Sequence, residues 1–276
     1  MDVIDTKINW FPGHMKKALD QIKDRTKLVD LFIEVVDSRC VTTSSNEELR
    51  KLANNKPILQ IALKEDWSTL NKAHNTNEHL LIGSIKNKAF KQTVIKKLYE
   101  ILDDKFVSKR KKGLVNPKFL IMIVGLPNVG KSSLINLLKS KNTVVAQNKP
   151  GVTKNQRIVN INQHFDLIDT PGILFKKIDN YEAAFKLGLI NCIKKEILPV
   201  EKVLEFGFNY LKENNLNELL QYYKIDSADN YYEFVEKVCR TRQYLISNEE
   251  LDINRFEDTV YNDFTLCKIA NVNYDK

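Results

Sequence analysis

An eight-residue segment near the middle of the chain, Gly125-Leu-Pro-Asn-Val-Gly-Lys131-Ser132, follows the P-loop pattern G-x-x-x-x-G-K-[ST]. An apolar run typical of a β-strand, residues 119–124, precedes it, and a helix-like run that starts at Ser133 follows it. In this setting the glycines let the backbone curl, so that several N–H groups and a helix N-terminus face an anion. The segment therefore predicts a nucleotide phosphate site; the alternative is an ordinary strand-to-helix turn that contains glycine.

The predicted phosphate site gives a role to each of its polar groups. Lys131 can reach the β- and γ-phosphates, and the Ser132 hydroxyl can ligate Mg²⁺. The remaining contacts to the nucleotide are expected from Asn128, Val129, Gly130 and Ser133.

The composition favours a cytoplasmic protein with an anionic partner. The 276 residues carry a net charge of +8, for which nucleic acid is the first candidate, although a basic protein without such a partner has the same charge. The four cysteines are far apart and form no C-x-x-C pair, which indicates thiols in a reducing compartment. No apolar run approaches the length of a membrane span, and the first residues lack the features of a signal peptide, so we predict no membrane partner.

The order of strand-like and helix-like runs predicts an α/β fold. Apolar strands are expected over residues 31–36, 58–63 and 80–82, ahead of the P-loop strand. Helical patterns lie between them, and strands that alternate with helices are typical of a mostly parallel sheet.

The rest of the chain divides into two kinds of pattern. Two alternating runs, 157–162 and 164–169, predict a hairpin. From about residue 179 helical periods dominate, so we expect a nucleotide-binding domain over residues 1–178 and a small all-α domain over 179–276. The basic stretch 105–118 is interpreted as a solvated connector or, alternatively, as a contact to phosphate.

Two strand ends that precede the P-loop carry the predicted base-reading groups. Lys64 and Asp66 end the strand over 58–63, and Ser84 ends the next one. Asp66 can accept hydrogen bonds from guanine N1–H and the exocyclic amine, whereas adenine has no N1–H, so a carboxylate discriminates between the two bases. The loop of Ser84 can offer backbone N–H groups to guanine O6. In an ordinary GTPase the base reader follows the P-loop, so the reversed order predicts a circularly permuted, Rossmann-like G domain.

Two segments behind the P-loop have the character of nucleotide switches. Asp169-Thr-Pro-Gly172 ends an apolar strand, where Asp169 can hold the Mg²⁺ shell and the Gly172 N–H can sense the γ-phosphate. Thr153, in the segment 150–153, is expected to close over Mg²⁺ and the γ-phosphate when GTP is bound. Because Gly172 lies close to the helical domain, its ordering is predicted to change how that domain docks.

The permuted order, together with Trp10-Phe-Pro-Gly-His-Met15, Val36-Asp-Ser-Arg39 and Asp169-Thr-Pro-Gly-Ile173, resembles the YlqF/RbgA family of bacterial GTPases, which act in assembly of the large ribosomal subunit. The resemblance covers nearly the whole chain. It implies hydrolysis of GTP to GDP and phosphate, stimulated by the pre-ribosomal particle, and a helical domain that docks on rRNA.

The chain departs from the family pattern at two places. Leu63 stands where the family has the asparagine of N-K-x-D, and leucine cannot pair with guanine N7. The D-A-R-x-P pattern is replaced by residues 37–41, Asp-Ser-Arg-Cys-Val, which bears on the local turn only.

Two further residues take candidate roles from the resemblance. Ile173 stands where many GTPases have a water-orienting glutamine, so His14 is the candidate to orient water; the alternative is a histidine that packs its own loop. Asn128 resembles the residue that binds K⁺ beside the phosphates in related GTPases, the alternative being a turn asparagine.

The sequence thus predicts a monomeric, GTP-hydrolysing assembly factor that binds the precursor of the large ribosomal subunit and does not bind DNA. Two alternatives stay open: a nucleotide-binding RNA placeholder with negligible turnover, and an NTPase that lost base selectivity through Leu63. Candidate RNA contacts in the helical domain, or else parts of solvated helix ends, are Lys237, Arg240, Arg242 and Tyr244.

Overall fold

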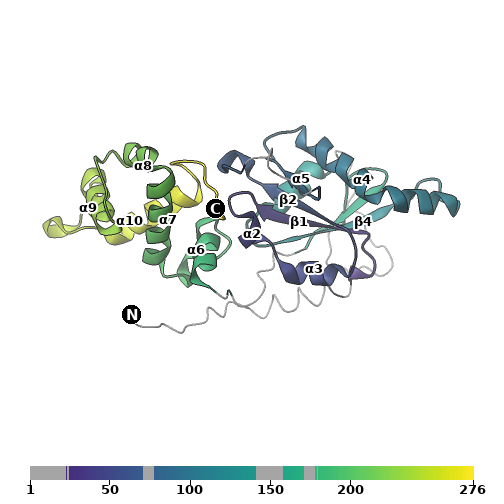
Figure 1. Ribbon diagram of the computed structural model, residues 1–276, viewed down its shortest axis with the longest axis horizontal. Coiled ribbons are helices and arrows are strands. Elements are labelled where there is room, and N and C mark those ends of the chain that lie inside the picture. Colours follow the sequence, from purple (N-terminus) through teal and green to yellow (C-terminus); the bar gives the residue numbers. More distant parts are fainter. Residues whose placement is uncertain (1–22, 24, 71–77, 141–157, 171–177, 179) are drawn as a thin grey trace.

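The computed structural model describes residues 23, 25–70, 78–140, 158–170, 178 and 180–276. Figure 1 shows two groups of elements: a sheet covered by helices, and a separate group of helices α6 to α10 beside it. This arrangement confirms the predicted α/β fold with helices in its C-terminal part. The boundary at 178/179 stays a prediction, because one apolar core runs without a break through both groups.

The sheet of the described residues has six strands in the order β3-β2-β1-β4-β6-β5. The strands are β1 (Leu31–Asp37), β2 (Ile58–Leu63), β3 (Leu80–Ile82), β4 (Phe119–Gly125), β5 (Ile158–Asn160) and β6 (Phe165–Ile168). All neighbours run parallel except β5 and β6, which form the antiparallel hairpin that the sequence predicts. Every residue of β1 is buried, as expected for a central strand covered on both faces.

Helices cover the two faces of the sheet. The helices of this part are α2 (Val41–Ser44), α3 (Glu47–Ala53), the 3₁₀ turn η1 (Glu65–Trp67), α4 (Phe90–Lys111) and α5 (Lys131–Leu138). In Figure 1 α3 lies on one face, and α4 and α5 lie on the other. The buried residues of α4 recur every four positions from Phe90 to Phe106, so that one stripe of the helix packs on the sheet.

The C-terminal part consists of helices that pack on one another. They are α6 (Tyr181–Leu189), η3 (Lys195–Ile197), α7 (Val200–Asn214), α8 (Leu216–Tyr223), α9 (Tyr231–Arg242), η4 (Ser247–Glu249) and α10 (Ile253–Thr265). Asn180, Asn230 and Asp252 each accept a backbone hydrogen bond at the start of a helix. A Cβ at Gly207 would lie 2.6 Å from Phe264 Cδ2, so this glycine allows the close approach of α7 and α10.

The last residues of the chain leave the helical part and return to the sheet. Val272 pairs with the backbone beside η1, and Tyr274 donates its N–H to the carbonyl of Arg39 (2.8 Å). All four cysteines are free thiols, of which three are buried. Within the described ranges, no helix combines the length and the apolar character that crossing a membrane requires.

Candidate nucleotide-binding site

The P-loop joins β4 to α5 and takes a backbone course that requires its glycines. Gly125 has φ +147°, and a Cβ there would lie 2.3 Å from the Val35 carbonyl oxygen of the neighbouring strand. Gly130 has φ +106°, and a Cβ there would lie 2.9 Å from Leu63 Cδ1. A side chain at either position would therefore push the loop away from β1 or from the end of β2.

Lys131 begins α5 and folds back over the P-loop. Its ammonium donates to the carbonyls of Gly125 (3.1 Å) and Leu126 (2.6 Å). Burial lowers the pKa of Lys131 to about 8, and the nearby Asp169 carboxylate opposes that shift. The side chain is thus held at the loop and can exchange carbonyl oxygens for phosphate oxygens.

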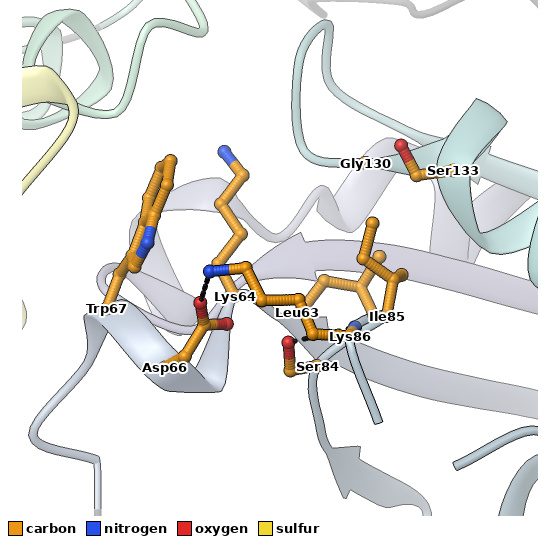
Figure 2. Close-up of a pocket in the computed structure, with 9 residues that line it drawn as sticks. All are labelled: Leu63, Lys64, Asp66, Trp67, Ser84, Ile85, Lys86, Gly130 and Ser133. Carbon is orange, nitrogen blue, oxygen red and sulfur yellow. Dashed lines mark hydrogen bonds and ion pairs between the residues drawn. The ribbon is translucent and has the colours of Figure 1, made fainter. Parts of the chain in front are cut away.

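A pocket lies where β2, β3 and the P-loop end, as Figure 2 shows. It brings together predicted residues from three separate segments, since Lys64, Asp66, Ser84, Gly130 and Ser133 all line it. The remaining lining residues are Leu63, Trp67, Ile85 and Lys86. Parallel strands place their carboxyl ends at one edge of the sheet, which explains how residues so distant in sequence meet.

Asp66 points into this pocket and is held by a partner that the sequence reasoning missed. Lys86 Nζ lies 2.5 Å from Asp66 Oδ2 (Figure 2). Burial by itself raises the pKa of Asp66, but hydrogen bonds from Lys86 and Ser84 outweigh it and hold that pKa below its usual range. The carboxylate is therefore ionised and able to accept hydrogen bonds. No local sequence pattern marks this pair, because Asp66 and Lys86 follow different strands and meet only in the folded chain.

Leu63 packs at the junction of β2 and the P-loop. It is 1% exposed and belongs to the apolar core, and its Cδ1 atom is the first that a Cβ at Gly130 would meet. Its contact with the P-loop is apolar, so this position supports the loop by packing.

A buried ion network joins the strand ends beneath the pocket. Asp37, at the end of β1, accepts from Arg39 Nη2 (2.7 Å) and Nε (2.8 Å), and from Lys64 Nζ (2.7 Å). Lys64 Nζ also donates to the Asn128 carbonyl (3.0 Å). Burial raises the pKa of Asp37, but the hydrogen bonds and charges of Arg39 and Lys64 prevail and hold it below its usual range. Lys64 thus connects the predicted base-reading loop to the P-loop, and the supporting roles of Asp37 and Arg39 were not predicted.

Asn128, at the tip of the P-loop, contacts the helical part. Its φ is +59°, and its side-chain amide donates to the Asn191 carbonyl (2.8 Å) just after α6. Val129, the next residue, is fully buried and anchors the loop in the core.

The residues predicted for Mg²⁺ lie at the same sheet edge. Ser132 is exposed on the first turn of α5, and the half-buried Asp169 follows β6, which pairs with β4. In the part of the chain that the structure describes, no group of three or more His, Cys, Asp or Glu side chains could hold a metal. One hydroxyl and one carboxylate nevertheless fit Mg²⁺, which usually takes its other ligands from water and phosphate. His14, Thr153 and Gly172 lie outside the described residues.

A mostly parallel sheet, a P-loop after β4 and a predicted base-reading loop that precedes it in the chain are the features of a P-loop GTPase with a circularly permuted G domain. A protein family described as 50S ribosome-binding GTPase matches residues 120–230, starting at β4. The chain is 37% identical over 270 residues to the probable ribosome biogenesis GTPase A of Mycoplasma genitalium, covering 98% of this chain and 97% of that protein. It therefore belongs to the ribosome biogenesis GTPase A family, as the motifs indicated.

More distant relatives are also similar to this chain over nearly its whole length. Ribosome biogenesis GTPase A of Priestia megaterium is 31% identical over 279 residues, covering 97% of this chain and 96% of that protein. The solved structure of GNP-bound YlqF from T. maritima has a TM-score of 0.65 at 23% identity, covering 94% of this chain and 97% of that one. At this identity the likeness supports the fold.

Proposed function

We propose that this chain binds and hydrolyses GTP with Mg²⁺ and, in its GTP state, docks on the precursor of the large ribosomal subunit. The pocket in which Asp66, Ser84 and Gly130 meet supports the nucleotide part of the proposal. The names of the relatives, which include ribosome biogenesis GTPase A, support the ribosomal part. The protein would act as a cytoplasmic monomer that contacts rRNA.

Recognition of guanine would use groups that already face the pocket. The ionised Asp66 would accept from guanine N1–H and the exocyclic amine, sharing its Oδ2 with Lys86. The backbone that follows Ser84 would donate to O6. Adenine would leave this carboxylate without the N1–H donor, so a bound adenine nucleotide would lack the charge-assisted hydrogen bonds that guanine forms with Asp66.

Phosphate binding would draw Lys131 from the P-loop carbonyls onto the β- and γ-phosphates. Ser132 and Asp169 would hold Mg²⁺, which neutralises charge that develops on the phosphates during transfer. Thr153 and Gly172 would close over the γ-phosphate, and His14 would orient the attacking water. The exposed Asn128 would reach K⁺ with its side-chain oxygen, since its amide nitrogen is occupied by Asn191.

Contact with rRNA would rely on cations that have no acidic partner inside the protein. Among the earlier candidates, Lys237 pairs with Asp226 (2.8 Å), Arg240 pairs with Glu236 (3.0 Å), and Tyr244 is only 8% exposed. These contacts favour the solvated-helix interpretation of that segment. The last turn of α4 ends the helix with positive charge. Lys109 there lies 3.9 Å from the Asp30 carboxylate, so the neighbouring Arg110 and Lys111 are the stronger candidates for phosphate contacts.

The decisive experiment measures GTP hydrolysis with and without purified large-subunit precursor, in K⁺ and in Na⁺ buffer. We expect slow turnover alone, faster turnover with the precursor, and a loss of rate in Na⁺. Co-sedimentation with the precursor should be stronger with a GTP analogue than with GDP. If turnover stays negligible with the precursor while co-sedimentation still depends on the nucleotide, the placeholder function is correct instead.

A further inference from the structure

The base-reading loop is short and has few hydrogen bonds of its own. It consists of η1, Glu65–Trp67, entered through Lys64 in the left-handed conformation (φ +64°). At the N-terminal end of this loop, the Glu65 N–H donates to the Gly83 carbonyl at 3.3 Å. The Asp66 carboxylate contacts Lys86, and the Ser68 hydroxyl donates to the Ser38 carbonyl (2.7 Å). The position of Asp66 depends further on what else holds the backbone immediately after it.

That backbone is held by the C-terminal tail, residues 272–275. Val272 N–H donates to the Trp67 carbonyl (3.1 Å), and its own carbonyl accepts from Thr69 N–H (3.2 Å). These two bonds form a parallel β-bridge between Val272 and Ser68. The Val272 side chain is 2% exposed, so the tail is packed as well as hydrogen-bonded at this point. Only one residue separates Asp66 from Ser68.

A second set of contacts fixes the tail to the end of β1. The Asp275 carboxylate accepts from Thr42 N–H (2.6 Å) and Thr43 Oγ1 (2.6 Å) at the start of α2. The guanidinium of Arg39, whose carbonyl accepts from Tyr274, lies 5.1 Å from the ring centre of Trp67. The tail thus braces the base-reading loop both directly and through Arg39.

The tail is also the direct continuation of α10. Arg39 Nη1 donates to the Thr265 carbonyl at the end of that helix (2.6 Å). A physical connection therefore runs from the helical part to the base-reading loop, separate from the predicted route through Gly172.

We propose that the tail 272–275 positions the guanine-reading loop, so that base selectivity depends on the segment that ends the helical part. This inference rests on the proposed function, because it concerns the same guanine pocket. The tail touches neither base nor phosphate in this arrangement; it sets where the Asp66 carboxylate stands.

The test compares the dissociation constants of GDP and ADP for full-length variants by titration calorimetry. Val272→Pro removes the backbone N–H that donates to the Trp67 carbonyl. The displaced Asp66 should then lose one charge-assisted hydrogen bond to guanine, so the ratio of the ADP to the GDP dissociation constant should fall about tenfold. The matched control is Asn271→Pro, because Asn271 is exposed and its N–H has no partner within the described residues. This control should keep the ratio of the unaltered chain.

A second pair of variants covers the case in which Val272→Pro does not fold. Asp275→Ala should lower the ratio as well, and Asp275→Asn should restore part of it because the amide keeps one acceptor oxygen. Poor folding lowers the number of binding sites, whereas the ratio reports only on folded molecules. A folded Val272→Pro or Asp275→Ala protein with unchanged selectivity would overturn the inference. If the unaltered chain itself does not prefer GDP to ADP, the proposed function fails and this inference fails with it.

Discussion

The buried carboxylate of Asp37 offers the sharpest test of how this site is held together. We expect Asp37→Asn, which keeps the size of the side chain, to destabilise the folded protein strongly. The change removes the negative charge between Arg39, whose side chain is 1% exposed, and Lys64. Because no cavity forms, the loss measures the electrostatic network rather than packing.

The size of the effect follows from the burial of the pair. Breaking a buried ion pair by removing one partner costs about 3–5 kcal/mol. In a chain of this length 1 kcal/mol corresponds to roughly 2–4 °C in Tm, so Tm should fall by roughly 6–20 °C. The pKa of Asp37 is held below its usual range. Its contribution is therefore present above the ordinary carboxyl range and is lost as the pH falls through the depressed pKa.

Thermal and urea unfolding of the nucleotide-free protein measure this effect. The matched control is Glu205→Gln, the same chemical change in the solvent-screened pair with Lys202 (2.8 Å), which should leave the Tm almost unchanged. Combining Asp37→Asn with Arg39→Met should show a coupling of about 0.5–3 kcal/mol, since the two residues are in contact. The interpretation would be refuted if Asp37→Asn lowered the free energy of unfolding no more than the control does, and if the effects of Asp37→Asn and Arg39→Met were additive in the double variant.

Four further predictions concern the nucleotide. Lys131→Ala should weaken binding of a GTP analogue by roughly 10²- to 10⁴-fold in calorimetry, because about two charge-assisted hydrogen bonds are lost; unchanged affinity would place the phosphates elsewhere. In the unaltered chain, burial lowers the pKa of Lys131 to about 8. The affinity for GDP should therefore fall as the pH rises above 8, because binding then requires proton uptake by Lys131. An affinity that stays constant up to about pH 10 would contradict this. Asp66→Asn should reduce the preference for GDP over ADP by roughly 10- to 150-fold, measured by competition, and an unchanged preference would exclude Asp66 as the base reader. Leu63→Asn should tighten GDP binding, because an amide in the pocket lining can donate to guanine N7. The same change should lower the Tm, because the position is buried. Weaker GDP binding would mean that the loop depends on the packing of leucine.

Much of this protein could be predicted from local patterns. The sequence predicted the P-loop, the strand ends at Asp66 and Ser84, and their order in the chain. Each of these features depends on a few neighbouring residues with fixed spacing. The alternation of strand-like and helix-like runs predicted the parallel strands. The alternating apolar pattern of two neighbouring runs predicted the hairpin of β5 and β6. The family followed from the same motifs.

The tertiary structure decided which groups support one another. The supporting contacts join segments that are distant in the chain. They are the ion pair of Lys86 with Asp66, the bonds of Lys64 to Asp37 and Asn128, and the backbone bond of Val272 to Trp67. No local pattern encodes them, because such a pair forms only when the sheet order and the course of the C-terminal tail bring its members together. The sequence by itself therefore determined the chemistry of the site, whereas folding alone determined how that chemistry is braced, since long-range hydrogen bonds and buried charges depend on three-dimensional proximity.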